Sequence, residues 1–370
     1  MSNSIQEIQT LGQSVWYDNI HRGQIKSGEL KGIIDSGITG LTSNPTIFDK
    51  AISESTDYDD SILALMQNTT DVNVVYESLV IEDIRSAADL LYPIYSRTNG
   101  LDGYASLEVN PHLAYDTKDT VDEAKRLFFK LDRPNIMIKV PATSPGIEAV
   151  QQLISNGINV NVTLTFSLQA YQGVRMAYIN GLEELYSSGG DIANIASVAS
   201  FFVSRLDTAV DGLLQQLIDD GATDVNALFG KAAIANAKLA YRDFSRDFAA
   251  NRFMILQSNG AKPQRPLWAS TSTKNPNYRD VLYVESLIGP NTVNTMPPST
   301  ISAFLDHGRP SISIDQQAEE SEYIFGSLKS HGIDMARITD QLLVDGVNLF
   351  ADSYDKLIKS IEQKMGNQLP

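Results

Sequence analysis

The sequence predicts a single α/β domain, a (β/α)₈ (TIM) barrel with extra helices and a long C-terminal helix. Eight short β-rich runs each precede a segment with apolar residues at helical spacing. This alternation is typical of parallel βαβ units, and eight such units close a barrel. The alternative is an open doubly wound sheet. No Gly-x-Gly-x-x-Gly motif follows the first run, which weakens the dinucleotide-binding form of that fold.

The eight strands are expected over residues 14–18, 37–42, 104–109, 135–140, 158–163, 195–200, 265–270 and 291–295. The long gaps after the second and sixth strands have helical spacing over 61–66, 72–91, 206–217 and 225–251. Inserted helices near 50–100 and 206–260 would explain a chain longer than the roughly 250 residues of a minimal barrel. Residues 334–365 are expected to form a helix outside the barrel or over one mouth. One domain is therefore expected over residues 1–370.

Composition restricts the classes of function. The chain has 45 acidic and 29 basic residues, a formal charge of −16, so no overall positive field attracts nucleic acid and no such partner is expected. Cysteine is absent and the four histidines lack zinc-ligand spacing, so neither a disulfide nor a metal site is expected. Residues 1–14 lack a signal-peptide pattern and no apolar run reaches about 18 residues, so a cytoplasmic protein without a membrane segment is expected.

The fourth strand carries a lysine on its polar face. Ile136, Ile138 and Val140 share one face and are expected to pack against helices, because strand side chains alternate between faces. Lys139 then points into the barrel near the carboxyl end of its strand. Active sites of this fold lie at that end.

The same alternation places other polar residues inside. Expected inside are Trp16, Asp18, Glu108, Asn159, Asn161, Thr163, Trp268 and Ser270; expected outside are Val15, Tyr17, Ala105, Leu107, Val109, Val160, Val162, Leu164, Leu267 and Ala269. A structural explanation stays open, because a strand-end lysine is often solvated and the two carboxylates could be its ion-pair partners. Convergence of polar groups on an interior face, where unpaired groups are costly, favours an active site.

A lysine among carboxylates in a dry barrel suggests Schiff-base chemistry. Burial lowers the pKa of an ammonium group, and the free amine attacks a ketone. The iminium accepts electrons as the adjacent carbon–carbon bond breaks. One acid must expel water from the carbinolamine and one base must take a hydroxyl proton. Two separated carboxylates could fill these roles without a metal or a cofactor.

Motifs along the chain match one family. They are Trp16-Tyr17-Asp18, Thr39-Gly40-Leu41-Thr42-Ser43-Asn44-Pro45-Thr46, Ser106-Leu107-Glu108-Val109, Ile138-Lys139-Val140-Pro141-Ala142-Thr143, Asn161-Val162-Thr163-Leu164, Ser200-Phe201-Phe202-Val203-Ser204-Arg205 and Val293-Asn294-Thr295-Met296-Pro297. On these residues the chain resembles the transaldolase family over nearly its whole length. The resemblance is to the longer bacterial-type branch of the class I, Schiff-base aldolase superfamily.

The resemblance implies an activity. A dihydroxyacetone unit would pass from sedoheptulose 7-phosphate or fructose 6-phosphate to glyceraldehyde 3-phosphate or erythrose 4-phosphate. The reaction would run through a lysine Schiff base, without a cofactor, in the non-oxidative pentose phosphate pathway. Sugar phosphates would be the partners, and a homo-oligomer is left open.

The resemblance also implies roles for residues of this chain. Lys139 matches the Schiff-base lysine, Glu108 the acid/base that acts through a water held also by Thr163, and Asp18 the base for the C4 hydroxyl. The remaining matches are substrate-binding Asn44, Asn161, Ser200 and Phe202, and phosphate-binding Arg205 and Ser270.

One position departs from the family pattern. Shorter members carry a second phosphate-binding arginine two residues after the serine that matches Ser270, where this chain has Ser272. Our hypothesis is that Ser272 lies in a phosphate-binding turn and that Lys274 supplies the second positive charge. The alternative is a surface lysine on a polar loop.

Three other functions stay open. Fructose-6-phosphate aldolases share the lysine and the fold, but they are shorter, tend to carry glutamine at the position of Glu108 and carry tyrosine at that of Phe202. Both residues and the chain length favour transfer. A metal-dependent phosphosugar enzyme would need ligands that the histidines do not supply. A non-catalytic sugar-phosphate binder would lack turnover, although each position expected for the chemistry is filled.

Overall fold

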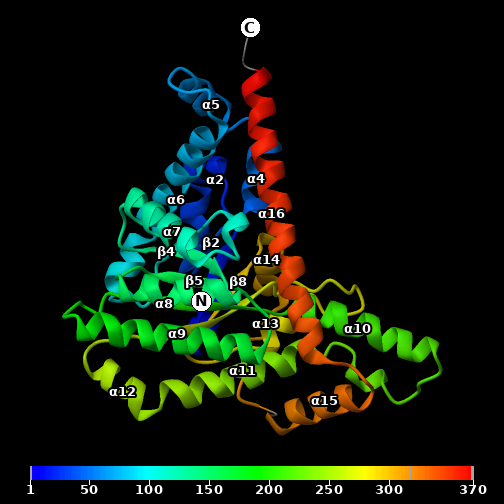
Figure 1. The fold of residues 1–370 in the computed structure, drawn as a ribbon. Helices are drawn as coiled ribbons and strands as arrows, with labels where there is room; N and C mark the ends of the chain where they lie inside the picture. The colour runs from blue at the N-terminus through cyan, green and yellow to red at the C-terminus, as the bar shows by residue number, and fades with distance from the viewer. Residues whose placement is uncertain (1, 317, 368–370) are drawn as a thin grey trace.

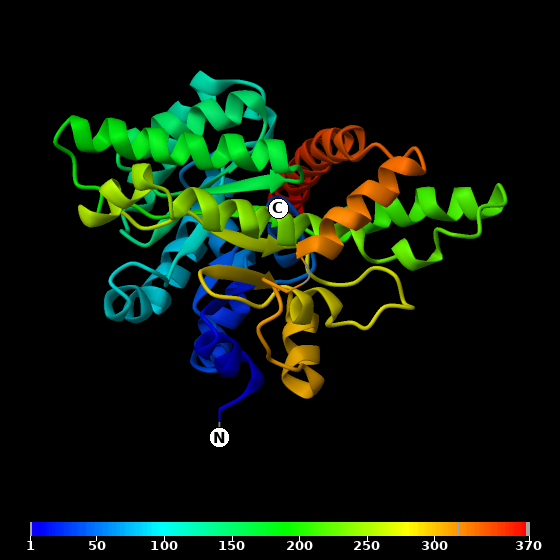
Figure 2. The ribbon, with the colours of Figure 1, turned by 90° about the horizontal axis from the view of Figure 1, so that it is seen from below.

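A computed structural model describes residues 2–316 and 318–367 and has eight parallel strands in a closed barrel, in the order β1 to β8. The predicted fold is therefore confirmed. Helices surround the strands on all sides (Figures 1 and 2). The strands are β1 (Gln13–Asp18), β2 (Gly40–Thr42), β3 (Ala105–Glu108), β4 (Ile136–Pro141), β5 (Val160–Thr165), β6 (Ser197–Phe202), β7 (Arg265–Ala269) and β8 (Thr292–Met296).

The helices are amphipathic and many begin at a residue whose side chain caps a backbone N–H, as Asn44 does for α4 and Thr143 for α8. No helix in the described ranges is long and apolar enough to cross a membrane. The helices are α1 (Ser4–Thr10), α2 (Arg22–Ser27), α3 (Glu29–Asp35), α4 (Pro45–Ser53), α5 (Asp59–Met66), α6 (Val72–Arg97), η1 (Pro111–Leu113), α7 (Thr117–Leu131), α8 (Ser144–Ser155), α9 (Leu168–Ser187), α10 (Ser204–Asp219), η2 (Asn226–Leu228), α11 (Ala232–Phe248), α12 (Asn251–Ser258), α13 (Leu282–Ser286), α14 (Pro298–His307), α15 (Ala318–Ser330) and α16 (Met335–Asn367).

Several elements have bounds that differ from the prediction; β5 and β6, for example, begin and end two residues later than expected. Two differences have a clear backbone cause. The sequence pattern starts the second strand at residue 37, but β2 begins at Gly40, because Gly37 has φ +121° and belongs to the turn after α3. The helix expected over 225–251 is interrupted. The short η2 turn precedes α11, and Gly230 between them has φ +68°, which an α-helix does not accommodate.

The predicted facing was wrong for Leu267, Trp268 and Ala269 of the seventh strand, whereas Ser270, expected inside, lines the cavity. Leu267 and Ala269 lie in the interior apolar cluster, whereas Trp268 packs outside against Phe201 at a ring separation of 6.1 Å. Arg265 explains the parity. Its guanidinium points inward and donates to Ser14 Oγ at 2.7 Å, so residues two and four positions later also face inward.

The predicted facing of Leu164 was also wrong. This residue has φ +57°, and the pairing of β5 with β6 shifts register between Val162 and Thr165. A bulge of this kind turns the following side chain. Leu164 therefore joins the interior cluster.

A polar network fills the amino end of the barrel. Asp102 accepts a hydrogen bond from Trp16 Nε1 at 2.6 Å and another from Ser14 Oγ. Arg265 lies 3.6 Å from the same carboxylate. These buried contacts close this end, so the accessible cavity lies at the carboxyl end.

Helix α16 crosses the carboxyl mouth and lies against α4 (Figure 1). The sequence left two positions open for this helix, outside the barrel or over one mouth. The helix lies over the mouth, since Phe350 and Ser353 line the cavity there. Hydrogen bonds hold the two helices together, among them Thr46 Oγ1 to Ser353 Oγ at 2.8 Å and Lys356 Nζ to Asp49 Oδ2 at 2.6 Å.

Candidate active site

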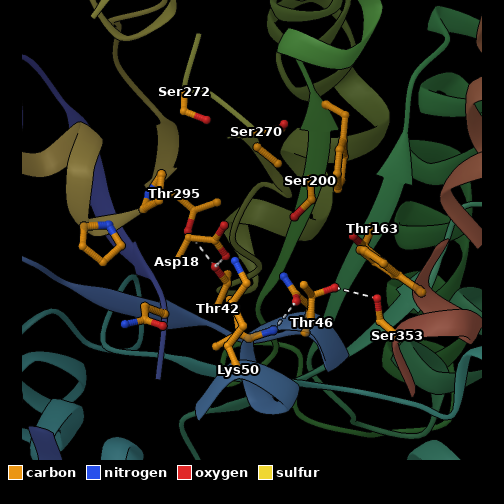
Figure 3. A pocket seen from close by; sticks show the side chains of 18 of the residues that line it. Asp18, Thr42, Thr46, Lys50, Thr163, Ser200, Ser270, Ser272, Thr295 and Ser353 are labelled. Carbon is orange, nitrogen blue, oxygen red and sulfur yellow. Dashed lines mark hydrogen bonds between the residues drawn. The ribbon is translucent and has the colours of Figure 1, made fainter. Parts of the chain in front are cut away.

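A cavity of about 720 Å³ opens at the carboxyl ends of the strands, within the range typical of small-molecule sites. Side chains from β1, β2, β6 and α4 point into it (Figure 3). The sequence-predicted residues in its wall are Asp18, Asn44, Lys139, Thr163, Ser200, Phe202, Arg205, Ser270, Ser272 and Lys274. Glu108 and Asn161, also predicted, lie behind this wall.

Lys139 stands at the centre of the polar groups. Its amine donates to the Ser43 carbonyl at 2.8 Å and to Glu108 Oε2 at 3.2 Å. The Phe350 ring centroid lies 5.8 Å from the same nitrogen. With a side chain only 6% exposed, this lysine is a buried group and not a solvated strand-end residue. Glu108 is its ion-pair partner, as the structural explanation expected. This ion pair is compatible with a catalytic role for both residues.

Glu108 is opposite Lys139 in the pairing of β3 with β4. Burial raises the pKa of its carboxyl above the ordinary 4.5; the Lys139 charge opposes this and the Asp18 charge adds to it. Glu108 borders a second cavity of about 10 Å³, the space of about one water molecule, which shares Asn44 with the main cavity.

Asp18 ends β1 on the other side of the cavity. Its Oδ1 accepts a hydrogen bond from Thr42 Oγ1 at 2.7 Å, and Thr42 Oγ1 is also 2.7 Å from Thr295 Oγ1 (Figure 3). Burial raises the pKa of the Asp18 carboxyl above 3.8, against lowering by the Thr42 hydrogen bond and by Lys139 and Lys274. Such a carboxylate is a stronger base than a solvated aspartate.

Asn161 supports the site from behind. Its Oδ1 accepts from Ser200 Oγ at 2.7 Å and its Nδ2 donates to Ser106 Oγ at 3.2 Å. It is fully buried, so in this structure it orients Ser200, which does face the cavity.

Thr163 also lies in the cavity wall, but its buried Oγ1 has no hydrogen-bond partner among the described residues. A buried hydroxyl of this kind is ready for a water or a substrate oxygen.

Cations and hydroxyls gather at the ends of β6 and β7. Arg205 lies in the first turn of α10 with its guanidinium 5.5 Å from the Phe202 ring, and burial lowers the pKa of this group. Ser270 has φ +57°, and its Oγ pairs with Ser204 Oγ at 2.9 Å. Lys274 Nζ donates to Ser272 Oγ at 2.9 Å. Two cations, several hydroxyls and a helix N-terminus form a setting suited to a phosphate.

Sequence reasoning missed Thr42, the Ser43 carbonyl and Phe350. The alternation rule could have found Thr42, which shares the inward parity of its strand and pairs with Asp18 in the barrel. The amphipathic pattern of α16 shows that Phe350 is buried, but it does not show that the helix covers Lys139. Among the residues described, no three His, Asp or Glu side chains gather closely enough to hold a metal ion.

Comparisons with known proteins agree with this geometry. The family model described as Transaldolase/Fructose-6-phosphate aldolase matches residues 15–361. The chain is 46% identical to Transaldolase 2 of Nostoc sp. over 98% of both chains. It is 46% identical to the transaldolase of Trichodesmium erythraeum over the full length of both. It is 45% identical to that of Thiobacillus denitrificans, over 97% of this chain and 99% of the relative.

Proposed function

The chain belongs to the transaldolase/fructose-6-phosphate aldolase family, and we propose that it is a transaldolase that acts through a Schiff base on Lys139. The observation that carries the mechanism is the buried Lys139 amine beside Glu108, in the wall of a cavity large enough for a sugar phosphate. The dihydroxyacetone donors are sedoheptulose 7-phosphate and fructose 6-phosphate. The acceptors are glyceraldehyde 3-phosphate and erythrose 4-phosphate.

Lys139 forms the Schiff base with the substrate, and Glu108 acts as the acid. The free amine adds to the ketone carbon C2, and the carbinolamine then loses water as the iminium forms. Glu108 supplies the proton for the departing hydroxyl. Its raised pKa lets it hold that proton at a higher pH than a solvated glutamate. The unpartnered Thr163 hydroxyl, in the wall of the main cavity with Lys139, provides an anchor for the water.

Asp18 breaks the carbon–carbon bond. As a base it removes the C4 hydroxyl proton, the C3–C4 electrons move into the iminium, and the aldose leaves with a new carbonyl group. The remaining enamine attacks the carbonyl of the acceptor, and Asp18 returns the proton. The Thr42 hydrogen bond holds the carboxylate in place for both steps.

The other site residues bind the substrate. Asn44 and Ser200 take the dihydroxyacetone hydroxyls, and Asn161 orients Ser200. Phe202 forms an apolar wall beside Arg205. Arg205, Ser270, Ser272 and Lys274 bind the phosphate at the far end of the sugar.

The compartment and the pathway of the protein follow from the same proposal. Residues 1–370 form one domain that works in the cytoplasm, in the non-oxidative pentose phosphate pathway, without a cofactor and without nucleic acid. The acidic charge of −16 and the absence of cysteine support this setting. The fructose-6-phosphate aldolase alternative is not favoured, because the curated relatives matched over nearly the full chain are named transaldolases.

Borohydride trapping with fructose 6-phosphate tests the mechanism. Intact mass and peptide mapping should find a reduced dihydroxyacetone adduct on Lys139. In Asp18→Asn, where the base is missing, the trapped adduct should keep all six carbons. Asp306→Asn, at an 83% exposed side chain, is the matched control and should give the three-carbon adduct. A folded protein that gives no adduct would refute the lysine mechanism.

A further inference from the structure

Phe350 is an aromatic residue of α16 on the cavity side of that helix. It is 4% exposed, lines the cavity, and has its ring centroid 5.8 Å from Lys139 Nζ. Its apolar neighbours belong to one cluster that includes Leu164, Phe166 and Phe202. An apolar wall therefore lies on one side of Lys139 and extends as far as its amine.

A glycine lets α16 approach the barrel closely. Gly346 lies about one turn before Phe350, and a Cβ at this position would come within 2.9 Å of Leu164 Cδ2. Leu164 is the residue that the β5 bulge turns inward. The bulge and the glycine together seat the helix low over the mouth, which brings Phe350 near the amine.

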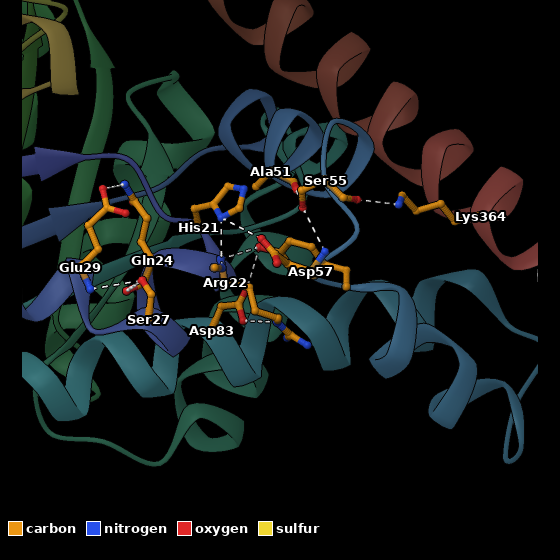
Figure 4. Close-up of polar contacts among 12 residues, drawn as sticks. His21, Arg22, Gln24, Ser27, Glu29, Ala51, Ser55, Asp57, Asp83 and Lys364 are labelled. Carbon is orange, nitrogen blue, oxygen red and sulfur yellow. Dashed lines mark hydrogen bonds and ion pairs between the residues drawn. The ribbon is translucent and has the colours of Figure 1, made fainter.

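Polar contacts join α16 to α4 and to the segment that follows α4. Ser353 bonds to Thr46, and the 4% exposed Asp49 carboxylate accepts from Lys356 at 2.6 Å and from Ser360 at 3.0 Å. Further along, Lys364 donates to the Ser55 carbonyl at 2.8 Å (Figure 4) and to Asp59 at 2.6 Å. Because these partners lie on one side of the helix, the Phe350 ring is held in a defined position over Lys139.

We propose that Phe350 is a specificity-determining residue that makes the lysine adduct pass its three-carbon unit to an aldose instead of losing it to water. The inference rests on the proposed function. After the first aldose leaves, the enamine can take a proton at its nucleophilic carbon and become an iminium. Water then adds at C2, the C2–Nζ bond breaks, and free dihydroxyacetone and the Lys139 ammonium are the products, with water supplying the ketone oxygen.

The ring opposes the hydration step of this side reaction. It occupies the space from which solvent would reach C2 of the adduct, so fewer waters are positioned for addition. Its face lies within the roughly 6 Å range of cation–π attraction, which keeps the ring against the cationic nitrogen of the iminium. An aldose enters from the open cavity instead, between Asp18 and Arg205.

The test measures how the adduct divides between the two outcomes. Dihydroxyacetone release from fructose 6-phosphate without an acceptor is compared with transfer to glyceraldehyde 3-phosphate, for Phe350→Leu, Phe350→Val and Phe350→Ala. The ratio of release to transfer should stay near the unmodified value in F350L, rise in F350V and rise about tenfold in F350A. Adduct lifetime, followed by borohydride quenching after rapid removal of substrate, should shorten in the same order.

Phe129→Ala is the matched control, because Phe129 is 70% exposed on α7, and its ratio should not change. An unchanged ratio in F350V and F350A, with both rates reduced equally, would show that Phe350 only supports the fold. A rise in F129A as well would mean that general loosening, not the Phe350 wall, sets the ratio. Absence of any adduct in the unmodified protein would instead refute the Schiff-base function itself, so the two failures are distinguishable.

Discussion

Lys139 and Glu108 stand opposite each other on neighbouring strands, and their charged groups approach to 3.2 Å with side chains only 6% and 5% exposed. Both charges have lost most of their hydration, so each depends on the other, and Lys139 also donates to the Ser43 carbonyl. The pair is a poor source of stability, because desolvation cancels much of the attraction. Its arrangement is instead suited to moving a proton between an amine, a carboxyl and a substrate oxygen.

Lys139→Met should destabilise the protein in a pH-dependent way. Without the lysine, Glu108 keeps its burial but loses the charge that lowers its pKa, so the folded-state pKa rises further above the unfolded value of 4.5. The folded state then binds more protons than the unfolded state, and stability falls as pH rises between the two pKa values. Near pH 8 the loss should be about 3 kcal/mol and below pH 4.5 it should largely vanish.

Denaturant unfolding of K139M from pH 4 to pH 8 measures this effect. Lys118→Met, at an 81% exposed side chain, should match the unmodified protein throughout. A pH-independent loss in K139M would mean that packing around the lysine stem, not the charge of Glu108, accounts for the destabilisation.

Thr42→Val should move the acid limb of the activity profile to higher pH. Asp18 must be ionised to act as base, so kcat/KM falls as pH drops through its pKa, which burial already raises above 3.8. The Thr42 hydroxyl lowers that pKa by donating to the carboxylate. Valine removes the donor at nearly constant volume, so Asp18 should accept its proton at a higher pH.

The measurement is kcat/KM against pH, within the range where circular dichroism shows no unfolding. Thr10→Val, on an exposed face of α1, is the control. A limb that stays in place or moves to lower pH in T42V would contradict the assignment of Asp18 as the base.

The barrel and most of the site could be predicted from the sequence because period-two alternation is a local property. It was sufficient for Lys139, Glu108 and Asp18, because the residues next to them in their strands, such as Ile138, Leu107 and Tyr17, pack into the outer core. It failed for β7, where Trp268 and its neighbours are all apolar and the inward face is set by the contacts of Arg265 with Ser14 and Asp102. It failed for Leu164 because a bulge depends on the partner strand.

The position of α16 could not be predicted for a similar reason. Its apolar pattern defines a buried face, but the partner of that face is fixed by contacts from residues distant in sequence, such as Asp49 with Lys356. The closeness of Phe350 to Lys139 is a consequence of those contacts. A single sequence carries no direct signal for it.

Lys274→Ala should weaken binding of phosphorylated substrates with little effect on turnover. The lysine lies in the cavity wall beside Ser272, so it can contribute a charge-assisted hydrogen bond of about 1.5–3 kcal/mol. KM for fructose 6-phosphate should rise about tenfold or more, and the rise should shrink in high salt, because screening weakens an exposed charge. Lys118→Ala should leave KM unchanged, whereas an unchanged KM in K274A would refute the second phosphate cation.

Gly40→Ala should destabilise the barrel, whereas Gly32→Ala should not. A Cβ at Gly40 would lie 2.4 Å from the Trp16 ring, which is fully buried and fixed by the 2.6 Å bond from Nε1 to Asp102. A ring held in this way cannot move aside, so overpacking should cost about 1–3 kcal/mol. Gly32 lies in α3, where a Cβ would meet no atom within 4 Å, and alanine there should stabilise by about 1 kcal/mol. Urea unfolding of both variants gives opposite signs if Trp16 and Gly40 face each other in register, and equal signs would contradict that register.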